Sequence, residues 1–129
     1  DALDGEVDLL YVDGAHGFGP ARADLSAWGA RVRPGGTMLV HDAFSSVGVT
    51  LALGATAAVG RRFRYVGRSR SMVEYRVEAL GPVARVGNAL RHLAQLPWFA
   101  RNLVLKAVLV VGGERWARRL GHRDAGWPY

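Results

Sequence analysis

Residues 7–16 read Val-Asp-Leu-Leu-Tyr-Val-Asp-Gly-Ala-His, and residues 37–42 read Thr-Met-Leu-Val-His-Asp. Each stretch opens with a short apolar run rich in strand-forming residues, and each ends with an aspartate and a histidine. Turn residues bound both runs, which is typical of buried strands rather than of helices. We therefore expect two buried strands that each carry an Asp and a His near the carboxyl end.

A helix is predicted between these strands. Pro20 suits its first turn, and residues 33–36 (Arg-Pro-Gly-Gly) end it and turn the chain. One face of this helix is apolar at helical spacing, and we expect Trp28 to join the core with it. The residues of this face are Ala21, Leu25, Trp28 and Val32. A strand, a helix and a strand of these lengths predict a βαβ crossover in a parallel sheet.

The rest of the chain divides into a hairpin region and a helical region. Residues 47–59 predict a second helix, and residues 63–66 and 72–77 predict two strands that form a hairpin across a tight connection. Further helices are predicted after residue 81, and Pro97 is expected to end the first of them. These helices cover residues 83–96, 98–111 and 114–120, and residues 121–129 are expected to be loose.

Composition and charge limit the function classes. Of the 129 residues 50% are hydrophobic and none is cysteine, which excludes a disordered chain, disulfides and zinc–thiolate sites. Residues 1–60 hold three arginines and seven acidic residues (net −4), whereas residues 61–129 hold fourteen basic and four acidic residues (net +10). Such an excess of positive charge is typical of contact with nucleic acid or an anionic membrane.

The basic helices favour a membrane over nucleic acid. Arginines alternate there with Trp98, Phe99, Trp116 and aliphatic residues, so we predict a peripheral membrane contact through residues 83–120. Alternatively, these helices pack on the sheet or form a homodimer contact. No nucleic-acid-binding module is recognisable, which disfavours that class of partner. The absence of cysteine and of a secretory leader in this sequence predicts a cytoplasmic protein, peripheral at the membrane.

The strand-end residues predict a functional site. Parallel strands end at one edge of a sheet, where α/β proteins place their ligands, so Asp13, His16, His41 and Asp42 are expected to converge. Two carboxylates can hold a divalent ion, and a neutral imidazole can accept a proton. Alternatively, the aspartates cap the helices that follow them, and the histidines bond to loop backbone.

The order of these motifs resembles a known family. The Asp-Gly-Ala-His of residues 13–16, a helix with Asp24 and Trp28, the Pro-Gly-Gly of residues 34–36 and the His-Asp of residues 41–42 occur in that order. The string is similar to the second half of a class I S-adenosylmethionine-dependent methyltransferase, in the small-molecule O-methyltransferase branch.

The resemblance implies an α/β fold and a division of the chain. Residues 1–80 would form the second half of a Rossmann-like methyltransferase sheet, made of the βαβ unit, a further helix and a C-terminal antiparallel hairpin. Residues 81–129 would form a basic amphipathic helical appendage. The reaction implied is methyl transfer from S-adenosylmethionine to a hydroxyl group of a small molecule or a sugar.

The resemblance also implies roles for the strand-end residues. Asp13, Gly14, Ala15 and His16 would form the cofactor-binding loop beside the methyl donor. His16 would be the general base, with His41 as the second choice, and Asp13 would also be catalytic.

This chain departs from the family's pattern at two places: a residue next to the metal-binding acids, and the donor-binding half of the fold. In metal-dependent relatives, acids that match Asp13 and Asp42 bind Mg²⁺, but Ala43 stands where catechol-type members often carry Asn. The glycine-rich donor loop and the ribose-binding acid belong to the first half of the family's fold and have no counterpart here. We therefore expect a fragment that binds the donor weakly or not at all. The alternatives are a non-catalytic remnant and a metal-dependent, hydroxylase-like member of the same fold.

Overall fold

The first half of the chain forms the predicted βαβ unit. A computed structural model describes residues 5–111 and 118–119. Strand β1 (Val7–Val12), helix α1 (Phe18–Ala27) and strand β2 (Val32–Val40) follow one another, and β1 pairs with β2 in parallel. A short 3-10 turn, Gly29–Arg31, leads from α1 into β2. The predicted crossover is confirmed.

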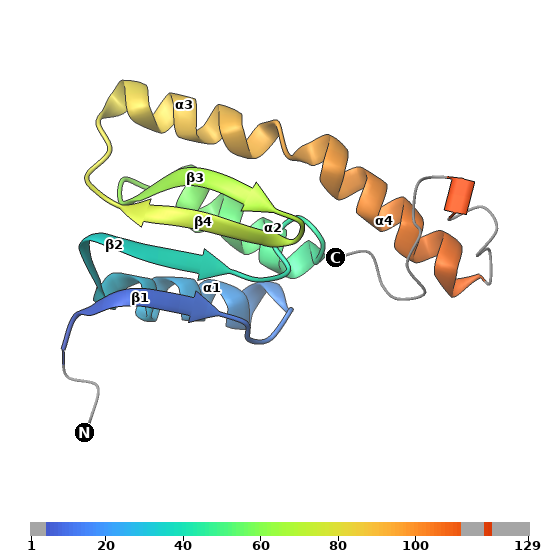
Figure 1. Ribbon diagram of the computed structural model, residues 1–129, viewed down its shortest axis with the longest axis horizontal. Coiled ribbons are helices and arrows are strands. Elements are labelled where there is room, and N and C mark those ends of the chain that lie inside the picture. The colour runs from blue at the N-terminus through green and yellow to red at the C-terminus, as the bar shows by residue number, and fades with distance from the viewer. Residues whose placement is uncertain (1–4, 112–117, 120–129) are drawn as a thin grey trace.

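A second helix and a hairpin complete the sheet. Helix α2 (Val47–Leu53) continues as one π-helical turn, Gly54–Ala58. Strands β3 (Phe63–Ser69) and β4 (Met72–Val77) are antiparallel, and the strand order is β1-β2-β4-β3. The hairpin is predicted correctly, although its connection is shorter than expected because β3 extends to Ser69. The result is a mixed four-stranded sheet of the predicted α/β class (Figure 1).

The core lies between the sheet and the helices α1 and α2, which cover one of its faces. Met38, Val40, Val73 and Tyr75 fill this space from the two central strands and are at most 1% exposed. On the other face of β1, Leu9 is 59% exposed and Tyr11 is 49% exposed. The expectation that β1 is a buried strand is therefore wrong for one of its faces, because no described helix covers that side.

The end of α1 also differs from the prediction. The helix ends at Ala27, so Val32 is buried as the first residue of β2 and not as part of a helical face. Trp28 is 41% exposed and lies against the Arg31 guanidinium, 5.3 Å away, so its assignment to the core is wrong. Residues 33–36 bulge out of the parallel pairing, where the positive φ of Gly35 (80°) suits glycine.

Two helices follow the sheet. Helix α3 (Pro82–Leu93) runs beside β3, and helix α4 (Leu96–Val110) extends past the ends of the strands (Figure 1). Pro97 lies in the first turn of α4 and does not end the preceding helix, because a proline nitrogen needs no hydrogen bond there. The predicted helix at 114–120, except residues 118–119, and the predicted loose segment 121–129 lie outside the described residues.

A buried asparagine joins α3 to the edge of the sheet. The Oδ1 of Asn88 accepts a hydrogen bond from the Tyr65 amide (2.7 Å), and its Nδ2 donates to the carbonyl oxygens of Ala57 (2.8 Å) and Phe63 (3.0 Å). Phe63 and Tyr65 belong to the edge strand β3, so the carboxamide replaces a neighbouring strand at this point. All three bonds are formed in a fully buried position, so Asn88 specifies where α3 docks.

His92, one turn further along α3, is held neutral by its partners. Its Nδ1 donates to the Asn88 carbonyl oxygen (2.8 Å), which leaves Nε2 to accept from the Tyr75 hydroxyl (2.9 Å). Burial lowers the pKa of His92 below the ordinary 6.5, although the bond to Asn88 acts in the opposite direction. Protonation of this imidazole in the folded protein would break its bond from Tyr75.

We expect acid to weaken the fold through His92. The unfolded chain binds a proton at this histidine near pH 6.5 and the folded chain does so only at lower pH. The free energy of unfolding should therefore fall as the pH drops from about 7 to about 5. Urea unfolding at several pH values measures this dependence. His92→Gln should flatten it over that interval, and an unchanged slope in this variant would contradict the assignment.

Candidate functional site

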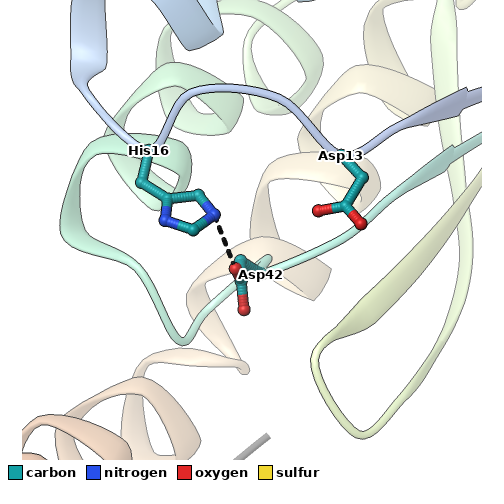
Figure 2. Close-up of side chains that lie close together, drawn as sticks. All are labelled: Asp13, His16 and Asp42. Atoms are coloured by element: carbon teal, nitrogen blue, oxygen red, sulfur yellow. Dashed lines mark ion pairs between the residues drawn. The ribbon is translucent and has the colours of Figure 1, made fainter.

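The carboxyl ends of β1 and β2 bring three of the predicted residues together. His16 lies in the loop after β1, and its Nε2 is 2.8 Å from Oδ2 of Asp42, which follows β2 (Figure 2). Asp13 follows β1 directly. One ligand atom from each of Asp13, His16 and Asp42 lies within 4.8 Å of the others. The convergence expected from parallel strand ends is present for these residues.

Asp42 is the buried member of this group. The residue is 5% exposed, and its Oδ1 accepts a hydrogen bond from the Ser45 hydroxyl at 3.0 Å. The His16 side chain is 59% exposed. Because a carboxylate can only accept, Nε2 of His16 donates to Asp42, which leaves Nδ1 as the proton-accepting nitrogen of the neutral ring. The pair therefore consists of an anchored carboxylate and an accessible imidazole.

The backbone after β2 is strained where it presents Asp42. Asp42 and Phe44 have φ values of 53° and 57°, in the left-handed region that a bulky side chain rarely adopts. Such conformations persist when surrounding contacts hold them, and they concentrate at functional sites. The amides of Ser45 and Ser46 both donate to the Asp42 carbonyl oxygen, at 3.2 and 3.0 Å, which closes this tight turn.

Asp13 and His41 lie beside the pair. The Tyr11 hydroxyl donates to Oδ2 of Asp13 at 3.1 Å. Desolvation, and then the hydrogen bond to Asp13, raise the pKa of Tyr11, so this phenol keeps its proton. Nδ1 of His41 is 3.4 Å from Oδ1 of Asp13 and 3.7 Å from Oδ2 of Asp42, and its side chain is 29% exposed. His41 is thus less accessible than His16.

The alternative roles in helix capping are contradicted. Gly17 is the N-cap of α1 and Ser46 is the N-cap of α2, and neither helix has a side-chain capping bond. The Ser46 hydroxyl donates instead to the His16 carbonyl oxygen, at 3.3 Å. Neither Asp13 nor Asp42 therefore serves as a helix cap, and the imidazole of His16 bonds to a carboxylate rather than to backbone.

Helix α4 holds the strained turn from the other side. Nζ of Lys106 donates to the Ser45 carbonyl oxygen (2.7 Å), and Nδ2 of Asn102 donates to the Phe44 carbonyl oxygen (3.1 Å). Sequence reasoning missed these residues, and it also missed Ser45. No local signal indicates them, since about 60 residues separate each bond's donor from its acceptor. The helical appendage is therefore part of the framework of the site.

Two cavities adjoin the site. A small pocket of about 10 Å³, close to the space of one water, lies under the loop of residues 13–16 and is also lined by His41. An open depression of about 400 Å³, within the usual range for small-molecule sites, lies on the other side of the pair. The depression is lined by His16, Asp42, Ser45, Ser46, Val47, Leu103 and Lys106.

Gly48 permits the close contact between α2 and the His16 loop. A Cβ atom at this position would lie 2.1 Å from the His16 carbonyl oxygen and 2.7 Å from the Phe18 amide nitrogen. These are backbone atoms, which cannot move aside as the end of a side chain can. The absence of a side chain at Gly48 thus fixes where His16 approaches Asp42.

We expect Gly48→Ala to displace His16 and to destabilise the fold by about 1–3 kcal/mol. Thermal unfolding measures the stability, and imidazole NMR signals report whether His16 still bonds to Asp42. Gly54→Ala is the matched control, because no heavy atom lies within 4 Å of a Cβ there and alanine favours a helix. Equal stability of the two variants would contradict this role of Gly48.

Part of the chain matches a known family. Residues 1–43 match the family model described as a methyltransferase domain. The match spans β1, α1 and β2 and ends one residue after Asp42. No curated protein and no solved structure matches the chain significantly. The mixed sheet is compatible with part of a Rossmann-like methyltransferase fold. Together these findings support a methyltransferase domain, of which residues 1–43 are the matched part.

Proposed function

We propose that the chain carries the acceptor side of a methyltransferase that methylates a hydroxyl group of a small molecule or a sugar. The observation that supports this most strongly is the His16–Asp42 pair, 2.8 Å apart, at the carboxyl ends of two parallel strands. Both residues of the pair lie within the stretch, residues 1–43, that matches a methyltransferase domain. A hydroxyl nucleophile must lose a proton during transfer, and an oriented imidazole is the usual group that takes it.

The acceptor is proposed to bind in the open depression beside the pair. There its hydroxyl would donate to Nδ1 of His16, while Asp42 stabilises the imidazolium that forms. Because Asp42 is buried and already bonded to Ser45, it holds the ring in one orientation. His16 is favoured over His41 as the base, since its side chain is the more exposed and lines the depression.

The donor is proposed to lie on the exposed side of the loop of residues 13–16. When bound, S-adenosylmethionine would supply a methyl group on a positively charged sulfonium; the acceptor oxygen would bond to this methyl carbon as its bond to sulfur breaks, and S-adenosylhomocysteine would leave as a neutral thioether. The half-exposed carboxylate of Asp13 suits the neighbourhood of that positive charge, with Gly14, Ala15 and His16 beside it. The pocket beneath the loop is far too small for this cofactor. We therefore propose that the donor-binding half of the fold lies in a further part of the protein.

A metal-assisted reaction is the second candidate, and the cluster of Asp13, His16 and Asp42 favours it. Two carboxylates suit Mg²⁺, but an imidazole nitrogen suits Mn²⁺ or Zn²⁺ better. The donor set therefore fits a transition metal more closely than the Mg²⁺ that the resemblance implies. In this case His16 would be a ligand instead of the base, and the ion would lower the pKa of the acceptor hydroxyl.

Donor turnover separates these proposals. The chain is first extended upstream until calorimetry shows that it binds S-adenosylmethionine. This extended protein is then incubated with phenolic and sugar acceptors, and release of S-adenosylhomocysteine is measured. We expect turnover that survives a chelator such as EDTA. Loss of turnover with EDTA and its return with Mn²⁺ would support the metal candidate. No donor binding in any extended form would indicate a non-catalytic remnant.

A further inference from the structure

Helices α3 and α4 turn polar side chains inward. The buried residues of α3 are Asn88 and His92, and those of α4 are Asn102 and Leu105. Three of these four side chains are polar, and each of the three is hydrogen-bonded to the sheet or to the loop that follows β2. A surface helix of a globular protein ordinarily buries its apolar stripe. In α3 the arrangement is reversed, whereas α4 buries Asn102 together with Leu105 and packs Trp98 and Phe99 against the core.

The outward side of the same helices is apolar. Val83, Val86, Leu90 and Leu93 of α3 are 57–87% exposed, and Val104 and Val110 of α4 are 52% and 73% exposed. We call these six residues the outer face. Arg91 is the one charged residue among the exposed positions of the two helices. A group of exposed apolar side chains of this kind marks a site that another molecule or a membrane covers.

Among residues 5–111 and 118–119, no other element covers the outer face. In the strand order β1-β2-β4-β3, helix α3 lies beside β3, at the opposite edge of the sheet from β1 (Figure 1). A further strand that extended the sheet at β1 would therefore be separated from β3, the strand that borders α3, by the three strands β1, β2 and β4. We therefore expect the outer face to contact a partner that is not part of the sheet.

The positive charge of the two helices favours an anionic partner for the outer face. Residues 81–111 contain Arg85, Arg91, Arg101 and Lys106 and no acidic residue. Two copies of this chain that met through this face would bring like charges together, whereas an anionic surface would be attracted. We propose that the outer face docks on the surface of an anionic lipid bilayer.

The helices lie on the bilayer rather than across it. By length and composition the stretch Pro82–Val110 could cross a membrane, and only 11% of its most apolar window is buried within the protein. A crossing would place Arg91 and Arg101 in hydrocarbon and would break the bonds of Asn88 and His92 to the sheet. A helix in the interface keeps these bonds and lets arginine side chains reach the headgroups.

Helix α4, which carries Val104 and Val110 of the outer face, also lines the candidate site. Leu103 of α4 is 36% exposed and also lines the open depression beside His16. Lys106, on the next turn, lines the same depression and bonds to the Ser45 carbonyl oxygen. Docking would therefore bring the mouth of the depression close to the bilayer. This proposal does not depend on the reaction at the site.

Vesicle co-sedimentation of the 129-residue chain tests the proposal. We expect the chain to sediment with phosphatidylcholine vesicles that contain about 30% phosphatidylserine. It should do so far less with pure phosphatidylcholine vesicles, and less at about 0.5 M than at about 0.1 M salt. Val86→Glu combined with Leu90→Glu should lower the bound fraction at least about tenfold, and Val83→Glu with Val110→Glu should have the same effect.

The matched control is Leu51→Glu combined with Val66→Glu. These residues, on α2 and β3, are 56% and 52% exposed, so this control adds the same charge away from the outer face. It should bind like the wild type, and circular dichroism checks that all variants fold. Absence of wild-type binding to anionic vesicles, or equal loss in control and test variants, would overturn the proposal. So would a dimer in light scattering that Val86→Glu/Leu90→Glu converts to a monomer.

Discussion

Replacing Asn88 with alanine should lower the free energy of unfolding by about 2–4 kcal/mol, and replacing it with aspartate should cost still more. Alanine removes three hydrogen bonds and leaves the Tyr65 amide and the Phe63 carbonyl of the edge strand without their partner. Aspartate keeps an acceptor for Tyr65 but turns a carboxylate oxygen toward the carbonyl oxygens of Ala57 and Phe63.

Urea unfolding followed by circular dichroism measures these losses, which are a large part of the stability of a small domain. Leu90→Ala is the matched control on the same helix, since Leu90 is 60% exposed and alanine is a good helix former. We expect its effect to stay within about 0.5 kcal/mol. An Asn88→Ala variant as stable as Leu90→Ala would show that α3 is held to the sheet by other contacts.

The elements of the fold were predictable because their signals are local. Each of the first two strands is an apolar run between turn residues, and the hairpin is two such runs separated by a few residues. The end of α1 was not predictable, because Val32 continues the helical spacing of Ala21 and Leu25 although it belongs to β2. One apolar position suits a buried strand as well as a helix face, and only pairing with β1 decides between them.

The sequence shows that α3 has an apolar face, but it does not show which way that face points. Val83, Val86 and Leu90 recur at helical intervals, which identifies one face and does not say what lies against it. The residues that decide the orientation are Asn88 and His92, whose partners lie on other elements. Polar residues in a helix are ordinarily assigned to solvent, so the sequence alone favours the opposite orientation.

The sheet topology made it possible to predict which residues of the candidate site come together, but not how they pair. Asp13, His16 and Asp42 were expected to converge because parallel strands end at one edge of a sheet. The pairing of His16 with Asp42 depends on the turn after β2, and that turn depends on Lys106 and on backbone bonds from Ser45. Contacts across this sequence distance leave no pattern in one sequence.

The largest effect that we expect on the proposed reaction is at Asp42. In the form that binds the donor, Asp42→Asn should lower methyl transfer by about 10²–10⁴-fold, although the fold stays intact. The asparagine carbonyl can still accept from Ser45, and asparagine tolerates the positive φ of this position. Its amide, however, donates to Nε2 of His16, which moves the ring proton to Nδ1. The nitrogen that faces the acceptor would then hold a proton instead of accepting one.

The tautomer of His16 gives a readout that does not need turnover. Nitrogen NMR of the 129-residue chain should find the His16 proton on Nε2 in the wild type and on Nδ1 in Asp42→Asn. Asp8→Asn is the matched control, because Asp8 pairs with Arg33 at the other end of β1 and should change neither the tautomer nor the rate. A changed tautomer with undiminished transfer would exclude His16 as the base, and an unchanged tautomer would contradict its orientation by Asp42. Only loss of transfer together with the proton shift fits a base that Asp42 orients.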